Sequence, residues 1–306
     1  MQIDLLIEQV LNGVQFGVML FLMAAGLTLI FGVMGLINLA HGSLYMVGAF
    51  ACAAVAAATG SFWLGLMASL AAAAAAGAIV EVVVLRRLYS RDHLDQVLAT
   101  FALILTFSEG TRWLFGSSPL YLNIPSALSG AVSLPGGLDY SLYRLFIIVV
   151  GIAVAVGLYF LIAHTRLGMR IRAGESDREM IAALGVDITT LYTLVFALGA
   201  ALAGLAGAMV GALQSVQVGM GEPVLILAFV VIVIGGIGSI KGALVGAVLV
   251  GVIDTLGRFL LPAALHLFLP ASQAASIGSS VASMLIYVFM ALVLAIRPQG
   301  LFSANA

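Results

Sequence analysis

The sequence predicts an all-α membrane protein, a polytopic bundle of about eight to ten transmembrane helices, some of them broken or re-entrant. Its 306 residues are 63% hydrophobic and 8% charged, whereas soluble chains carry about 25% charged residues. Long runs without a charge recur, and a helix that spans the bilayer needs about 20 mostly apolar residues. The 35 glycines suit close helix packing in lipid. We therefore expect one integral membrane domain over residues 1–306.

The charge-free runs predict nine spans, of which the second is a candidate for a broken helix. They lie near residues 10–33, 36–58, 62–85, 96–116, 142–163, 188–212, 222–237, 242–261 and 278–296. Basic residues gather after the third, fifth, seventh and ninth spans, which favours a cytoplasmic location for all four groups. The stretch 117–140 has no basic residue and is expected to be an extracytoplasmic loop. We predict a multi-pass inner-membrane protein with its N-terminus outside and its C-terminus inside.

A polar segment, residues 164–187, interrupts this apolar sequence. Its 24 positions hold 4 of the 12 basic residues and 4 of the 13 acidic ones. Apolar runs long enough to cross a bilayer lie on both sides of it, so we expect the polar segment to lie in water on the cytoplasmic side.

Local signals within the polar segment predict a short helix over Asp177–Leu184. Ser176 and Glu179 have the spacing of a capping box, and acidic residues suit the first turn of a helix. Gly185 follows as a left-handed stop. One face of this helix gathers three apolar side chains, those of Met180, Ile181 and Leu184.

An isolated helix of this length is only marginally stable in water, so its apolar face needs a cover. The face could pack on loops of the same chain, or a partner protein could take it into a groove. The spacing alone favours neither.

Two polar breaks interrupt apolar runs elsewhere. Asn38, His41 and Ser43 either line a translocation path or cap a break in the helix near the cytoplasmic face. We favour the capping role for Asn38. For His41, the residues favour neither a position close to the path nor one away from it. The second break, QSVQVGMGEP, predicts an outward-side turn or a re-entrant segment at the entrance of the path, with a plain loop as the alternative. Its polar residues are Gln214, Gln217 and Glu222.

Two charge pairs within the spans are expected to be structural. Glu109 and Arg112 are three residues apart, and Asp254 and Arg258 are four apart, so each pair shares one helix face. Glu81, which precedes two arginines, is expected at the membrane interface.

Several classes of site are excluded by the sequence. The chain contains no G-x-x-x-x-G-K-[ST] phosphate loop, so it has no nucleotide site of that type. Its net charge of −1 gives no basic surface for nucleic acid, and its four histidines lack metal-ligand spacing. No catalytic constellation is visible, which makes a membrane-embedded enzyme the least favoured class.

Four blocks, in order, resemble the permeases of branched-chain amino acid ABC importers. The polar segment is similar to their coupling-helix loop, in which an R-A pair, here Arg172–Ala173, precedes A-x-L-G, here 182–185. Gly26–Gly48, Gly235–Gly246 and the tail RPQGLF match the other blocks. Two residues depart from the pattern: Ser43 stands where an acidic residue is common and Lys241 where proline is common.

The resemblance implies a permease subunit that translocates branched-chain or other hydrophobic amino acids and has no cofactor of its own. ATP and Mg²⁺ would bind on two ABC ATP-binding partner subunits. A periplasmic solute-binding protein, membrane lipid and a second related permease, in a heterodimer rather than a homodimer, complete the implied partners. The residues that the resemblance assigns to coupling are Arg172, Glu175, Ser176, Asp177, Arg178, Glu179, Met180, Ile181, Leu184 and Gly185. The alternatives are import of urea, short amides or aromatic acids by the same machine, and a passive channel.

Overall fold

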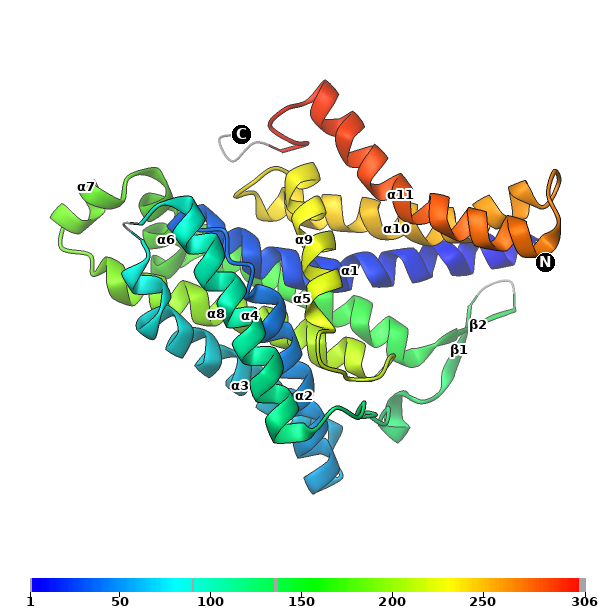
Figure 1. Cartoon of the computed structure of the whole chain (residues 1–306), viewed down its shortest axis with the longest axis horizontal. Helices are drawn as coiled ribbons and strands as arrows, with labels where there is room; N and C mark the ends of the chain where they lie inside the picture. Colours follow the sequence, from blue (N-terminus) through cyan, green and yellow to red (C-terminus); the bar gives the residue numbers. More distant parts are fainter. Residues whose placement is uncertain (1, 90, 135–136, 303–306) are drawn as a thin grey trace. The chain divides into compact units, whose positions relative to one another are not determined.

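The computed structural model describes residues 2–89, 91–134 and 137–302, and Figure 1 shows that helices dominate this part of the chain. The all-α prediction is confirmed. The described elements are α1 (Gln2–Met34), α2 (His41–Thr59), α3 (Phe62–Val83), η1 (Leu85–Arg87), α4 (His93–Phe115), η2 (Ser126–Leu128), β1 (Ala131–Leu134), β2 (Leu138–Ser141), α5 (Leu142–His164), α6 (Arg166–Ser176), α7 (Arg178–Ala183), α8 (Ile188–Gly211), α9 (Gly221–Gly235), α10 (Ile240–Leu265) and α11 (Ala271–Ile296).

Among the described residues, seven helices are long and apolar enough to cross a membrane, namely α1, α2, α3, α5, α8, α10 and α11. The predicted spans 96–116 and 222–237 fall on α4 and α9, which do not meet this standard. α4 is long enough, but Asp95, Glu109 and Arg112 lower its hydropathy. α9 has 15 residues, about 22 Å at 1.5 Å per residue, whereas the hydrocarbon core is about 30 Å thick. The chain is therefore a multi-pass membrane protein that also contains an apolar helix too short to cross the hydrocarbon core.

The chain divides into two compact units. The first comprises residues 1–21, 126–152 and 229–306, and the second comprises residues 22–125 and 153–228. Each unit is assembled from segments that are distant in sequence. The single permease domain over residues 1–306 stays a prediction.

In the first unit, α10 and α11 lie side by side (Figure 1). The early part of α1 packs on α10 through glycines, since a Cβ built on Gly13 would lie 2.8 Å from the Cα of Val252. β1 and β2 form an antiparallel hairpin in which Ala131 faces Ser141. Asp254 accepts two hydrogen bonds from Arg258, at 2.9 and 3.0 Å, which confirms that predicted pair.

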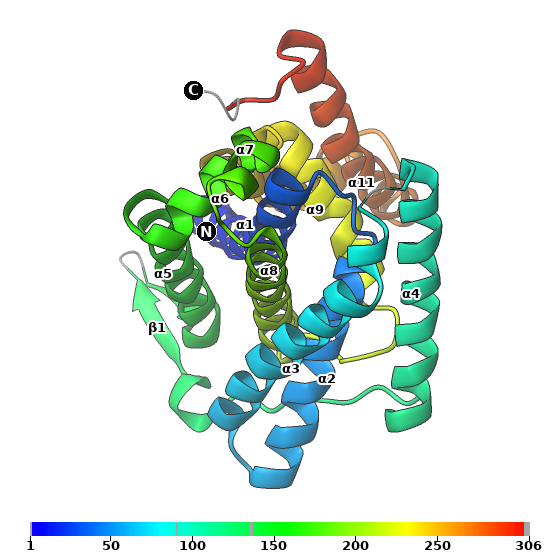
Figure 2. The same ribbon diagram turned by 90° about the vertical axis from the view of Figure 1, so that its left-hand side faces the viewer.

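In the second unit, α2, α3 and α8 pack against one another (Figure 2). Small residues allow this approach: the hydroxyl of Ser69 donates to the carbonyl of Gly204 at 2.8 Å, and Gly48 also meets the backbone of Gly204. The other predicted pair, Glu109 with Arg112, is likewise formed, on the exposed surface of α4. The core of this unit is thus built on close backbone contacts, as helix packing in lipid favours.

Candidate functional site

The polar segment begins with a helix that the sequence did not lead us to expect. α6 starts after Thr165, whose hydroxyl accepts a hydrogen bond from the amide of Gly168 at 3.0 Å. A side chain at Gly168 would overlap the carbonyls at the end of α5, and the guanidinium of Arg172 donates to the carbonyl of Ile162. α6 is therefore held tightly against the last turn of α5.

The N-terminus of α7 differs from the predicted capping box. Ser176 is the last residue of α6, so it does not cap α7. Asp177 does so: its Oδ1 accepts from the amides of Glu179 at 3.0 Å and Met180 at 2.9 Å. The amide of Asp177 ends α6 by donating to the carbonyl of Ala173, so one residue separates the two helices. The prediction was wrong by one residue because the first helix was missed, which left Ser176 apparently free to cap.

The C-terminus of α7 is the predicted glycine stop. Gly185 has φ 86°, a conformation that favours glycine. Its amide donates to the carbonyl of Ala182 at 3.0 Å, and the amide of Val186 donates to the carbonyl of Ile181 at 3.2 Å. These two bonds form a Schellman motif, and α7 is six residues long where about eight were expected.

The apolar face of α7 is divided between the protein and solvent. Ile181 is 7% exposed and packs inward, whereas Met180 is 59% exposed and Leu184 is 75% exposed. This chain therefore covers one of the three residues and leaves two uncovered, and the docking of those two in a partner's groove stays a prediction. Arg178 begins α7, but its side chain lies outside the described residues.

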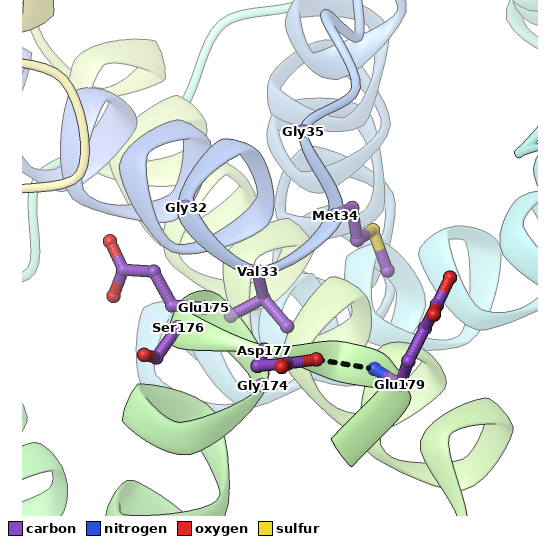
Figure 3. Close-up of a pocket in the computed structure, with 9 residues that line it drawn as sticks. All are labelled: Gly32, Val33, Met34, Gly35, Gly174, Glu175, Ser176, Asp177 and Glu179. Carbon is purple, nitrogen blue, oxygen red and sulfur yellow. Dashed lines mark hydrogen bonds between the residues drawn. The ribbon is translucent and has the colours of Figure 1, made fainter. Parts of the chain in front are cut away.

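A cavity of about 370 Å³ lies between α7 and the end of α1, within the second unit (Figure 3). One wall is the last turn of α1 and Gly35, and the other is the junction of α6 and α7. Glu175, Asp177 and Glu179 line the second wall, where they add to the negative end of the α1 dipole. Glu175 is exposed overall, but neighbouring atoms desolvate its carboxyl and raise its pKa. The cavity is therefore acidic.

Asp187 fixes the other end of the polar segment, and sequence reasoning did not assign it this role. Its Oδ1 accepts from the amides of Thr189 at 2.9 Å and Thr190 at 3.2 Å, and both threonine hydroxyls also donate to the carboxylate. These hydrogen bonds lower the pKa of Asp187 to about 2. The signal was present, because an aspartate directly before an apolar periodic run is a typical helix start.

The first polar break separates α1 from α2. Gly35 has φ 65°, and the side-chain oxygen of Asn38 accepts from the amide of Ala40 at 3.0 Å, just before α2 begins at His41. This bond satisfies a free amide within the break, as expected of Asn38, but no side chain caps the first turn of α2 itself. Asn38 and His41 are fully buried and Ser43 is 3% exposed. In the described part of the chain, both ring nitrogens of His41 and the hydroxyl of Ser43 have no hydrogen-bond partner.

This break extends from the polar segment to the middle of α8, because Gly35 lines the cavity beside Asp177 whereas His41 lies next to Gly26, which meets Gly199. A Cβ built on Gly26 would lie 2.5 Å from the carbonyl oxygen of Gly199 and 3.0 Å from Nε2 of His41. Gly199 is halfway along α8, which runs from Ile188 to Gly211. The position of the break near the cytoplasmic face stays a prediction, and the sequence did not reveal that His41 reaches the middle of α8.

The second polar break leads from α8 into α9 and meets the first. Val216 exchanges two backbone hydrogen bonds of 2.8 Å with Leu120, and Gly219 turns the chain with φ 86°. A Cβ built on Gly42 would lie 2.8 Å from the carbonyl oxygen of Gly221, so the starts of α2 and α9 are in backbone contact. Glu222 is half-buried beside Gly221, whereas Gln214 and Gln217 are exposed.

Comparison with known proteins gives one family over nearly the whole chain. The family described as "Branched-chain amino acid transport system / permease component" matches residues 9–294. The high-affinity branched-chain amino acid transport system permease protein BraD of Pseudomonas aeruginosa is 32% identical over 265 residues, 82% of this chain and 86% of that protein. The corresponding protein LivH of Escherichia coli K12 is 29% identical over 82% of this chain and 85% of its own length. The ribose import permease protein RbsC of the same strain is 27% identical over 76% of this chain and 72% of its own length.

Proposed function

We propose that this chain, which belongs to the family of branched-chain amino acid transport system permease components, is the membrane subunit of an ATP-driven ABC importer in the inner membrane. Its substrates are branched-chain or other hydrophobic amino acids. The observation that carries the proposal is α7: a short helix, fixed at both ends, that presents Met180 and Leu184 to solvent. The absence of a phosphate loop from the sequence supports the assignment of ATP and Mg²⁺ to partner subunits.

The exposed face of α7 is the proposed docking point for an ATP-binding subunit. Burying Met180 and Leu184 in an apolar groove would remove the uncovered surface that the fold leaves there. Glu175, Asp177 and Glu179 line the cavity beside α7 and form no ion pair among the described residues, so basic residues next to the groove would complement them. Two such subunits would serve the permease pair, in which the second permease is a related chain.

The translocation path is proposed to pass the contact between the starts of α2 and α9. Interrupted helices that begin at mid-depth are typical of transporter binding sites, because their N-termini offer free amides to an anionic group. His41 and Ser43 lie buried there without partners, and both can hydrogen-bond a substrate's polar end. Asn38 and Glu222 flank them, while Gln214 and Gln217 lie nearer the entrance, where a periplasmic solute-binding protein would deliver the substrate.

Uptake by the assembled importer tests the proposal. The permease is co-expressed with the ATPases, second permease and binding protein encoded beside it, and radiolabelled leucine uptake into proteoliposomes is measured with ATP inside. We expect uptake that requires ATP and is blocked by vanadate. Uptake that is insensitive to both would identify a passive channel. A thermal-shift screen of the binding protein against amino acids, urea, short amides and aromatic acids then decides the substrate class.

A further inference from the structure

A buried carboxylate at the end of α3 joins the polar segment to the helix core. The side chain of Glu81 is 0% exposed, although the sequence places it beside two arginines where we expected the membrane interface. An ionised carboxylate is costly to bury unless it is paired and hydrogen-bonded. Its neighbours satisfy this requirement completely.

Both oxygens of Glu81 accept two hydrogen bonds. Oε1 accepts from Nε of Arg86 at 3.3 Å and from the hydroxyl of Tyr89 at 2.8 Å. Oε2 accepts from Nη2 of Arg86 at 3.0 Å and from the hydroxyl of Thr193 at 2.6 Å. Nη2 of Arg86 also donates to the Thr193 hydroxyl at 2.9 Å, so Glu81, Arg86 and Thr193 are all hydrogen-bonded to one another. With Tyr89 they form a network of four residues.

This network connects elements that are distant in sequence. Glu81 belongs to α3 and Thr193 to α8, six residues after the Asp187 cap that ends the polar segment. Tyr89 reaches the sulfur of Met34 at 4.0 Å, and Met34 lines the acidic cavity beside α7. The network therefore makes two contacts next to the polar segment. One is with α8, the helix that follows α7, and the other is with the end of α1, which lies beside the α6–α7 junction.

The segment that connects α7 to Glu81 is restrained by hydrogen bonds and close packing. The Schellman bonds at Gly185 and the Asp187 cap fix the four residues, 184–187, between α7 and α8, so a displacement of α7 is transmitted to the first turns of α8. α3 in turn packs closely on α2, because a Cβ built on Gly65 would lie 2.7 Å from the carbonyl oxygen of Cys52. α2 begins at His41, in the buried polar break.

We propose that Glu81 is the positioning residue that makes α3 and α8 move as one body when α7 is displaced, and so passes ATPase movement to the start of α2. This inference rests on the proposed function, since it takes α7 as the ATPase contact. Glu81 does not touch substrate in this account. It acts by holding Thr193 of α8 to the η1 end of α3 through Arg86 and Tyr89.

The test measures leucine transported per ATP hydrolysed by the full importer in proteoliposomes. Glu81→Gln keeps the shape of the side chain but removes the charge that four donors share, and Thr193→Val removes only the hydroxyl of α8. We expect both variants to bind the ATPases as wild type does while the transport ratio falls about fivefold or more. The matched controls are Glu109→Gln, in the exposed Glu109–Arg112 pair, and Thr106→Val, whose hydroxyl bonds only its own helix. Both controls should keep the wild-type ratio.

Two outcomes would overturn the inference. An unchanged ratio with wild-type rates in both test variants would show that α3 and α8 need no tie. An unchanged ratio in which the rates of uptake and hydrolysis fall together would reduce Glu81 to a stabilising role. If Glu81→Gln does not insert, Thr193→Val decides, because it leaves the Glu81–Arg86 pair in place. Failure of the proposed function has a different signature, namely wild-type protein that neither retains ATPases nor shows ATP-dependent uptake.

Discussion

Gly42 and Gly221 are in direct backbone contact: a Cβ added to Gly42 would lie 2.8 Å from the carbonyl oxygen of Gly221. The two residues are 179 positions apart, and each lies in the first turn of a helix that follows a polar break. The contact joins the two breaks that we propose as the translocation path. Because backbone atoms meet on both sides, a side chain at Gly42 would require one helix to shift.

Gly42→Ala tests whether this contact is required. The added methyl group overpacks two backbones, so we expect a loss of about 1–3 kcal/mol in stability and a marked loss of uptake. Gly110→Ala is the matched control, because Gly110 is also within a helix and a Cβ there meets no atom within 4 Å. Melting of the detergent-purified proteins by intrinsic fluorescence gives the comparison. Equal melting temperatures for wild type and Gly42→Ala would show that α2 and α9 are free to separate.

The cap of α7 is tested by two substitutions at one position. Asp177→Asn keeps an oxygen that can accept from the amides of Glu179 and Met180, whereas Asp177→Ala leaves both amides without that acceptor. We expect the alanine variant to destabilise α7 by about 1 kcal/mol and the asparagine variant to have little effect. Hydrogen exchange of the α7 amides reports this difference. The cap would be irrelevant if both variants exchanged at the wild-type rate.

Gly185 provides a test of the helix stop. Its φ of 86° is strained for a residue with a Cβ, so Gly185→Ala should cost about 1–2 kcal/mol, with Gly185→Asn better tolerated. We expect Gly185→Ala to lower uptake while insertion is unchanged, since the turn positions α7 relative to α8. Wild-type uptake by Gly185→Ala would mean that this turn has no part in coupling.

The Asp187 cap predicts a dependence on pH. Its carboxyl has a pKa of about 2 in the folded protein against an ordinary value of 3.8, so its stabilising effect is fully present above about pH 5. As the pH falls through 3.8 the unfolded chain binds this proton first, so the effect declines, and it is lost once the folded carboxyl is also protonated below about pH 2. The difference in melting temperature between wild type and Asp187→Asn should therefore shrink over this interval and stay constant from pH 5 to 7. A constant difference down to pH 2 would contradict the assigned hydrogen bonds.

Features that depend on neighbours in sequence were predictable. The all-α class, the glycine stop at Gly185 and the ion pairs at three- and four-residue spacing follow from hydrophobic runs and helix geometry, and the structure confirms them. The cap of α7 was missed by one residue because Ser176 and Asp177 are both good caps, and only the preceding helix decides between them.

Features that depend on the packing of distant segments could not be read from the sequence. Nothing in the sequence near Glu81 indicates that Thr193 donates to it, so a buried carboxylate was taken for an interfacial one. The division of the α7 face, with Ile181 inside and Leu184 outside, likewise depends on tertiary packing. The meeting of Gly42 with Gly221 depends on how deep each helix begins.

The measurement that decides the role of α7 is retention of the ATP-binding subunits by the purified permease. Leu184→Asp places a charge on the residue of α7 that is 75% exposed, where it cannot disturb the folded core, and Leu184→Met keeps the surface apolar. We expect Leu184→Asp to insert normally but to retain at least about tenfold less ATPase and to lose uptake, with Leu184→Met close to wild type. Retention of the ATPases and full uptake by Leu184→Asp would show that α7 is not their docking point.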